Sequence, residues 1–240
     1  MNIKLVAILL LGLCVFSCGM LAACTGRNQT LPHQLVLQKP ATLNHSGQII
    51  WQMDSPKTVY LTFDDGPDPV NTPIILDILK KYNVKVTFFV LGHKAQKNPA
   101  LIKRIKYDGH ILGNHTFTHI DGTVVDLKKI RAEINSTHQL LQTICGVKVT
   151  LFRPPFGFFN WRVFAAAKSR GYQIALWTFD LSDWSVHSSD QYVKTVAENL
   201  ADGAIILMHD GGPKREALIE ALPKIIELIK KRGYKFSNCF

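Results

Sequence analysis

The chain has 240 residues, 47% of them hydrophobic, with 28 Lys and Arg against 18 Asp and Glu and a formal net charge of +10 at pH 7. This composition predicts a globular protein with one sizeable core and excludes a disordered or fibrous chain. The positive charge favours anionic partners, but no basic run with interleaved aromatic residues accompanies it, so we expect no nucleic-acid binding. A solvated, lysine-rich surface would explain the charge equally well.

The first 23 residues have the plan of an export signal. Lys4 is followed by an uncharged, mostly apolar stretch from Leu5 to Ala23. The sequence Leu21-Ala22-Ala23-Cys24 resembles the bacterial lipobox, in which the cysteine is lipidated and becomes the new N-terminus. We therefore expect residues 1–23 to be a lipoprotein signal peptide, with a cleaved soluble protein and an uncleaved signal anchor as alternatives. All three place the remaining chain outside the cytoplasm, in the bacterial cell envelope.

Residues 24–50 are expected to form the lipidated Cys24 and a polar tether, which contains Pro32 and Pro40. Residues 51–240 are expected to form the catalytic domain, with the folded part beginning near Ile49. Beyond the signal region the sequence has two cysteines, Cys145 and Cys239. An oxidising compartment would permit a disulfide between them, and two separate thiols are the alternative.

From there on, short β-rich runs alternate with stretches of helical spacing. Strands are predicted over Thr58–Phe63, Lys85–Val90, His110–Gly113, Val149–Phe152, Gln173–Thr178, Ala204–Met208 and Lys235–Ser237. Helices are predicted over Thr72–Tyr82, Pro99–Tyr107, Thr123–Ile144, Trp161–Arg170, Asp190–Leu200 and Lys214–Arg232. About seven such units indicate an α/β barrel with fewer than eight strands, and an open doubly wound sheet is the alternative.

Acidic, histidine and arginine residues follow five of these strands directly. They are Asp64 and Asp65, His115 and His119, Arg153, Asp180 and Asp183, and His209. Parallel strands would open all five loops at the same carboxyl edge of the sheet. Residues far apart in the sequence would then form one site, and this set of residue types indicates a metal-dependent hydrolase.

Asp65, His115 and His119 are the candidate metal ligands. The two histidines are four positions apart, a spacing that brings two imidazoles to one metal when the segment makes a helical turn. No Glu follows His115, which excludes the HExxH zinc-protease helix. Three protein ligands leave a position for water, as in catalytic zinc sites, and Asp64 would stay free to take a proton. A simple Asp-Gly-Pro turn would also account for the acidic motif.

Five motifs together resemble those of the polysaccharide deacetylases, the family with the NodB-homology domain, also called carbohydrate esterase family 4. They are TFDDGP at 62–67, HTFTH at 115–119, RPPFG at 153–157, DLSDW at 180–184 and LMH at 207–209. They occur in the family's order and extend the resemblance over about residues 57–240. The resemblance implies a distorted, incomplete (β/α) barrel of about seven parallel strands. It also implies hydrolysis of N-acetyl or, less often, O-acetyl groups on carbohydrate.

The resemblance also implies a role for each motif residue. Asp64 would be the general base, paired with Arg153, and His209 the general acid, oriented by Asp183. Asp65, His115 and His119 would bind one divalent metal, with Zn²⁺ expected and Co²⁺, Ni²⁺ or Mn²⁺ fitting the same ligands. The backbone N–H of Phe156 would stabilise the oxyanion, and Trp184 and Leu207 would line the pocket for the acetyl methyl group. Phe156 stands where many relatives have Tyr.

The function expected from these motifs is hydrolysis of N-acetyl groups on an N-acetylglucosamine polysaccharide, with peptidoglycan as the expected polymer. The expected partners are this glycan and, through the lipid on Cys24, a membrane. Chitin-like oligomers, poly-N-acetylglucosamine and acetylated xylan are alternative substrates. An alternative of another class is a non-catalytic glycan-binding envelope lipoprotein that keeps the fold.

Overall fold

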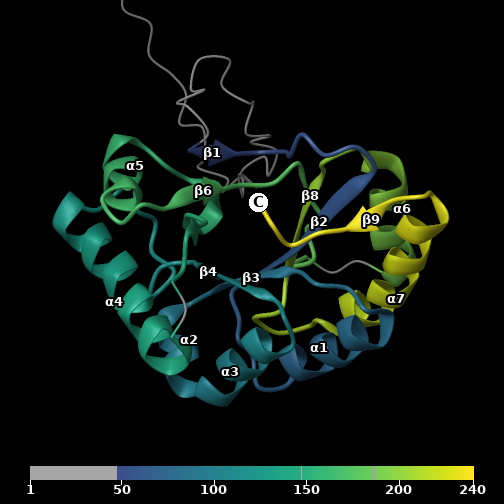
Figure 1. Cartoon of the computed structure of the whole chain (residues 1–240), viewed down its shortest axis with the longest axis horizontal. Helices are drawn as coiled ribbons and strands as arrows, with labels where there is room; N and C mark the ends of the chain where they lie inside the picture. Colours follow the sequence, from purple (N-terminus) through teal and green to yellow (C-terminus); the bar gives the residue numbers. More distant parts are fainter. Residues whose placement is uncertain (1–47, 147, 186–187) are drawn as a thin grey trace, which may run out of the picture. The chain divides into compact units, whose positions relative to one another are not determined.

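The computed structural model describes residues 48–146, 148–185 and 188–240 (Figure 1). The expected signal peptide, Cys24 and all but the end of the expected tether lie outside the described residues. The strands are β1 (Ile49–Ile50), β2 (Thr58–Asp64), β3 (Thr87–Val90), β4 (Ile111–Asn114), β5 (Leu151–Phe152), β6 (Gln173–Ala175), β7 (Phe179–Asp180), β8 (Ile205–His209) and β9 (Lys235–Phe236). The α-helices are α1 (Asn71–Tyr82), α2 (Gly92–Lys97), α3 (Pro99–Tyr107), α4 (Leu127–Cys145), α5 (Trp161–Lys168), α6 (Ser189–Asn199) and α7 (Glu216–Lys231).

The strands form a parallel sheet in the order β1-β6-β5-β4-β3-β2-β8-β7, and β9 pairs with the start of β2. In the part of the chain that the structure describes, no pairing joins β1 to β7, so the sheet is not a closed barrel. Figure 1 shows the helices arranged around the outer side of this sheet. The expected incomplete α/β barrel is confirmed, with eight strands on its path where about seven were expected.

The sheet is curled because of a short connection between β6 and β7. These strands lie six steps apart in the strand order, which would separate them by about 29 Å in a flat sheet. Only residues 176–178 join them, and such a link spans at most about 14 Å. The two ends of the strand order must therefore approach each other, which excludes the flat, doubly wound alternative.

The same connection explains a difference from the sequence-based prediction of one strand over Gln173–Thr178. β6, which pairs with β5, ends at Ala175. The chain then pairs with β8, beginning with Thr178 N, which donates to the Ile205 carbonyl at 2.8 Å. The sequence also gave no sign of α2 or of the two-residue strand β1, which pairs with β6. Two residues are too few for a hydrophobic period, and no β-rich run of greater length is predicted around β1, whereas β5 and β9 lie within predicted runs.

The core forms between the buried strands and one apolar face of each helix. Every residue of β2 after Thr58 is buried, as expected for a parallel strand covered on both faces. Helix α7 buries Leu218, Leu222, Ile225 and Ile229, which are spaced at the helical period. The helix predicted from Thr123 begins at Leu127 in the structure. Asp126 caps it by accepting from Lys129 N at 2.7 Å.

Cys145 and Cys239 form no disulfide, so of the two alternatives the structure has separate thiols. Among residues 48–146, 148–185 and 188–240, no helix has both the length and the apolar character needed to cross a bilayer.

Gly203, in the loop before β8, packs closely against Met53 in the segment after β1, and this contact gives a testable prediction. Gly203 and Gly171 both have left-handed backbones, with φ of 71° and 72°. A Cβ on Gly203 would lie 1.7 Å from the Met53 carbonyl oxygen, whereas nothing lies within 4 Å of one on Gly171. We expect Gly171→Ala to lower the free energy of unfolding by about 1 kcal/mol and Gly203→Ala by at least about 2 kcal/mol more. Equal losses in urea unfolding would contradict this assignment.

Candidate active site

Parallel register brings the predicted site residues to one edge of the sheet. Asp64 ends β2 directly opposite His209, which ends β8. His115 follows β4, and its N–H donates to the Val90 carbonyl at the end of β3 at 3.0 Å. Arg153 follows β5. The prediction that these loops meet at one edge is therefore confirmed.

Arg153 is the fully buried centre of this edge, with no exposed surface. One terminal nitrogen, Nη1, donates to Asp64 Oδ1 and to Thr62 Oγ1, both at 2.8 Å. Its Nε and Nη2 donate to the carbonyls of Ala175 and Leu176 at 2.9 and 2.8 Å, where β6 ends. Burial lowers the pKa of Arg153, and Asp64 opposes this shift. The guanidinium thus fixes the Asp64 carboxylate and balances its charge inside the protein.

Asp65, His115 and His119 form a group whose ligand-type atoms all lie within 4.8 Å of one another. Asp65 Oδ1 lies 3.5 Å from His115 Nε2 and 3.2 Å from His119 Nε2. His115 Nδ1 lies 2.7 Å from the Arg153 carbonyl, which directs the opposite ring nitrogen toward Asp65. Burial raises the pKa of Asp65, but His115 and His119, together with His209 and Lys94, outweigh it, and the pKa lies below its ordinary value.

This group fits a divalent cation. Asp65 Oδ1 is buried and has no hydrogen-bond partner in the described residues, although it faces two imidazole nitrogens. A buried polar atom without a partner is costly, and a metal ion would satisfy it. Two imidazoles and one carboxylate are also a common donor set of catalytic zinc sites.

The segment from His115 to His119 is not the helical turn that the four-residue spacing predicted. It is an irregular bend in which Thr116 and His119 have positive φ values of 69° and 62°. The two imidazoles still meet, with ring centroids 5.1 Å apart. The residue spacing was informative, but the backbone conformation inferred from it was wrong.

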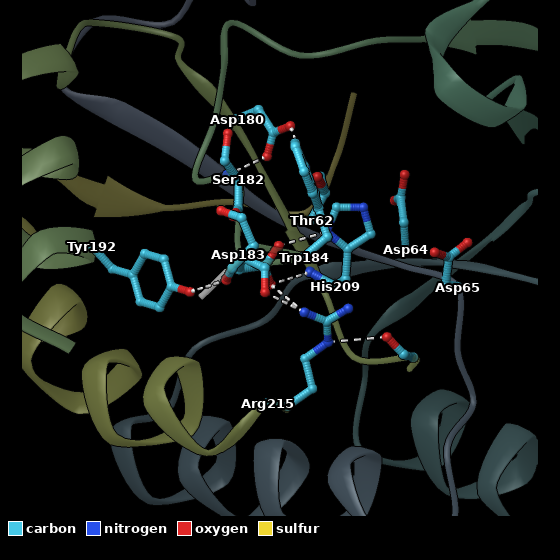
Figure 2. A network of polar contacts seen from close by, with 12 residues as sticks. Thr62, Asp64, Asp65, Asp180, Ser182, Asp183, Trp184, Tyr192, His209 and Arg215 are labelled. Atoms are coloured by element: carbon cyan, nitrogen blue, oxygen red, sulfur yellow. Dashed lines mark hydrogen bonds and ion pairs between the residues drawn. The ribbon is translucent and has the colours of Figure 1, made fainter. Parts of the chain in front are cut away.

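His209 and Asp183 form a second ion pair at the same edge, shown in Figure 2. His209 Nδ1 lies 2.6 Å from Asp183 Oδ1, and the His209 N–H donates to Asp183 Oδ2 at 2.9 Å. Burial lowers the pKa of His209, but Asp183, with smaller contributions from Asp64 and Asp65, outweighs this effect and raises the pKa to about 9. Figure 2 draws the imidazole between Asp183 and the carboxylates of Asp64 and Asp65, so a protonated His209 faces the acidic motif.

Asp180, Asp183 and His209 also have ligand-type spacing. Both oxygens of Asp183 are already engaged by His209, and Asp180 Oδ1 accepts from Ser182 N at 2.7 Å. This second group is therefore better described as a hydrogen-bonded network than as a metal site. Trp184, which is half-exposed, extends from it and lies 3.5 Å from Asp180 Oδ2 through its indole nitrogen.

The other predicted site residues also lie near this edge. Leu207 is buried in β8, two residues before His209. Phe156 has a left-handed backbone with φ of 62°, and its exposed ring packs 4.7 Å from that of His119. The two backbone hydrogen bonds of its turn are donated by Gly157 and Phe158, so neither uses the Phe156 N–H.

Arg215 supports the Asp183–His209 ion pair, and the sequence gave no indication of this role. Arg215 is buried where α7 begins, and its Nε donates to the Gly211 carbonyl at 3.0 Å. Its Nη1 donates to the Asp183 carbonyl and lies 3.9 Å from Asp183 Oδ2. Figure 2 shows this guanidinium beside Asp183. The sequence shows only a basic residue in the Gly-rich loop after His209, and residue spacing in a loop does not reveal that this residue contacts Asp183.

Known proteins resemble this chain in sequence. The family model described as polysaccharide deacetylase matches residues 52–175. A peptidoglycan-N-acetylglucosamine deacetylase of Bacillus cereus is 38% identical over 197 residues, which cover 81% of this chain and 92% of that protein. A chitooligosaccharide deacetylase of Rhizobium leguminosarum bv. trifolii is 35% identical over 193 residues, covering 76% and 90% of the two chains.

Solved structures resemble it too. The crystal structure of the Bc1960 peptidoglycan N-acetylglucosamine deacetylase has a TM-score of 0.77 at 36% identity, covering 80% of this chain and 90% of that one. BA3943 of Bacillus anthracis, a CE4 family pseudoenzyme, has a TM-score of 0.75 at 31% identity, covering 80% and 68%. The fold, the family match and the relatives agree: this chain belongs to the polysaccharide deacetylase family.

Proposed function

We propose that this chain hydrolyses N-acetyl groups on N-acetylglucosamine units of peptidoglycan. The observation that carries this proposal is the meeting of two buried ion pairs, Asp64–Arg153 and Asp183–His209, beside the Asp65, His115 and His119 group. Amide hydrolysis needs a group that accepts a proton, a group that donates one, and stabilisation of the developing charge. The similarity to peptidoglycan deacetylases supports the choice of polymer.

Asp65, His115 and His119 would hold the divalent cation, and Zn²⁺ suits their two imidazoles and one carboxylate, although Co²⁺, Ni²⁺ or Mn²⁺ would fit the same donors. When bound, such a cation supplies Lewis acidity to the acetyl carbonyl and to the attacking water. His115 is held for this task by the Arg153 carbonyl.

Asp64 is the proposed general base. Its Oδ1 is taken by Arg153, so Oδ2 is the oxygen that would accept the proton of the attacking water. The buried guanidinium of Arg153 lies 2.8 Å from Asp64 Oδ1 and balances the charge of the carboxylate. It also restrains the orientation of the carboxylate, because the guanidinium itself is fixed by three further hydrogen bonds, to Thr62, Ala175 and Leu176.

His209 is the proposed general acid for the leaving amine. Asp183 engages Nδ1, so Nε2 is the nitrogen that would donate the proton. With a pKa of about 9, His209 carries that proton at neutral pH. The Phe156 N–H is the proposed donor to the oxyanion, and Trp184 and Leu207 are the proposed walls for the acetyl methyl group.

Other substrates and one other class remain as alternatives. Chitin-like oligomers are favoured by the similarity to chitooligosaccharide deacetylases, and the same chemistry would serve poly-N-acetylglucosamine or acetylated xylan. The pseudoenzyme among the similar structures means that the fold alone does not imply activity. The presence of Asp64, Arg153, Asp183 and His209 in paired geometry favours an enzyme over a non-catalytic glycan-binding lipoprotein.

We also propose that the domain is anchored in the cell envelope by a lipid on Cys24. This proposal depends on the sequence of residues 1–24, an apolar signal that ends in Leu21-Ala22-Ala23-Cys24. A single acyl chain holds a protein only weakly at a bilayer, so stable anchoring needs a second chain or a second signal such as a basic patch.

Replacement of Asp64 tests the proposed base. Asp64→Asn should reduce acetate release from N-acetylglucosamine polymers by at least about 100-fold, because the amide cannot take a proton from water. Zinc binding should persist, since Asp64 is not among the proposed ligands. Asp54→Asn, at an exposed position, serves as the control and should keep full activity. A variant that binds zinc and retains wild-type acetate release would reject Asp64 as the base.

The Asp183–His209 pair predicts a pH dependence of stability. Asp183 raises the pKa of folded His209 to about 9, so the pair's contribution is complete below about pH 6.5 and disappears as the pH rises through 9. In urea unfolding with a chelator present, the stability difference between wild type and Asp183→Asn should shrink from pH 6 to pH 10, by up to about 3 kcal/mol, because Asp64 and Asp65 also contribute to the raised pKa of His209. A difference independent of pH would show that His209 is neutral in the folded protein.

The anchor is tested by metabolic labelling with a fatty acid in the bacterial host. We expect the wild type to be labelled and to sediment with membranes, and Cys24→Ser to lose the label. Cys18→Ser is the matched control, because Cys18 follows a poorer lipobox, and it should behave as wild type. Unlabelled wild type that still sediments would favour the uncleaved signal anchor.

A further inference from the structure

The bend between the two metal-site histidines depends on hydrogen bonds from outside itself. Residues 116–119 are not helical, so their backbone N–H groups have no partners from a helical ladder. In space, the bend contacts α2 on one side and α4 on the other. On the α2 side, Gly92 N and His93 N donate to the Thr116 and Phe117 carbonyls, both at 3.0 Å.

All four N–H groups of the bend donate to side chains. Thr116 N donates to Asn114 Oδ1 at 2.9 Å, and His119 N donates to Thr116 Oγ1 at 3.0 Å. The two N–H groups in the middle, from Phe117 and Thr118, both donate to Glu133 Oε2, at 3.0 and 2.8 Å. One carboxylate oxygen of α4 therefore satisfies the centre of the segment that joins the two histidines.

The other oxygen of Glu133 completes the contact. Glu133 Oε1 accepts from Thr118 Oγ1 at 3.0 Å and pairs with Lys129 Nζ at the same distance. The residue is only 4% exposed and lies on the buried face of α4 with Ile130 and Ile134. Burial raises the pKa of Glu133, but Lys129 and Thr118 outweigh it and lower the pKa below its ordinary value, so the carboxylate is ionised.

A buried carboxylate on an apolar helix face is costly unless its partners need it. An apolar residue at position 133 would continue the face of α4 but would leave the Phe117 and Thr118 N–H groups without acceptors. The buried charge of Glu133 is therefore explained by its role as acceptor for the N–H groups of the bend. The bend in turn brings together the two histidines at its ends.

We propose that Glu133 is a positioning residue of the metal site, which holds His119 in line with His115 by fixing the backbone between them. The inference rests on the proposed metal site of Asp65, His115 and His119. His115 has its own restraint in the Arg153 carbonyl, 2.7 Å from Nδ1. His119 is the last residue of the bend, directly after Thr118, so loss of Glu133 should act mainly on His119.

The test measures zinc affinity of the full-length protein by competition with a chromophoric chelator, without any assay of activity. Glu133→Ala should weaken zinc binding roughly 10- to 100-fold, the usual effect of removing a group that orients a ligand. Glu133→Gln should fall between this variant and the wild type, because its amide oxygen can still accept from both N–H groups. The Co²⁺ absorption spectrum of Glu133→Ala should also change, since one imidazole is displaced.

Glu198 provides the matched control. It pairs with Lys194 four residues earlier, as Glu133 pairs with Lys129, but it is exposed on α6. Glu198→Ala and Glu198→Gln should bind zinc as tightly as the wild type. If Glu133→Ala fails to fold, the comparison of Glu133→Gln with Glu198→Gln decides.

Two results would overturn the inference, and they are distinguishable. The inference is wrong if the folded Glu133 variants keep wild-type zinc affinity and an unchanged Co²⁺ spectrum. Glu133 would then contribute only to the packing of α4. Failure of the wild type itself to bind Zn²⁺ or Co²⁺ would reject the proposed metal site, and the role of Glu133 with it.

Discussion

The buried guanidinium of Arg153 is the interaction on which the geometry of the site depends. Its side chain joins β2 to the end of β6 and fixes Asp64, while its backbone carbonyl orients the His115 ring. A charge with no exposed surface is stable only when its partners surround it, so the strand ends must be in register for the fold to form. The proposed base and the proposed metal site are therefore positioned by one residue.

The same principle extends across the edge of the sheet. Three buried carboxylates each have an opposite charge or a set of N–H donors: Asp64 has Arg153, Asp183 has His209 and Arg215, and Glu133 has the bend and Lys129. Two other carboxylate oxygens at this edge, Asp65 Oδ1 and Asp210 Oδ1, are buried without a hydrogen-bond partner in the described residues, and Asp65 Oδ1 faces two imidazoles. Because Asp65 Oδ1 lies beside two imidazole nitrogens, it is the oxygen whose missing partner a cation would supply.

Much of this could be predicted from sequence because parallel strands convert order along the chain into proximity. The motifs at Asp64, His115, Arg153 and His209 each follow a recognisable strand, and one shared edge brings them together. Periodicity did not reveal β1, the separation of β6 from β7, or the bend at His115 to His119. Glu133 and Arg215 were missed for a different reason, because their roles depend on contacts between elements that no residue spacing encodes. The export signal and Cys24 remain predictions from the sequence.

The central claim is that this edge of the sheet catalyses metal-dependent deacetylation, and acetate release tests it most directly. The purified protein would be incubated with intact peptidoglycan and, separately, with N-acetylglucosamine oligomers, before and after treatment with a chelator. The account predicts release from peptidoglycan that stops with the chelator and returns when zinc is added. Absence of release from both substrates by protein with zinc bound would contradict it.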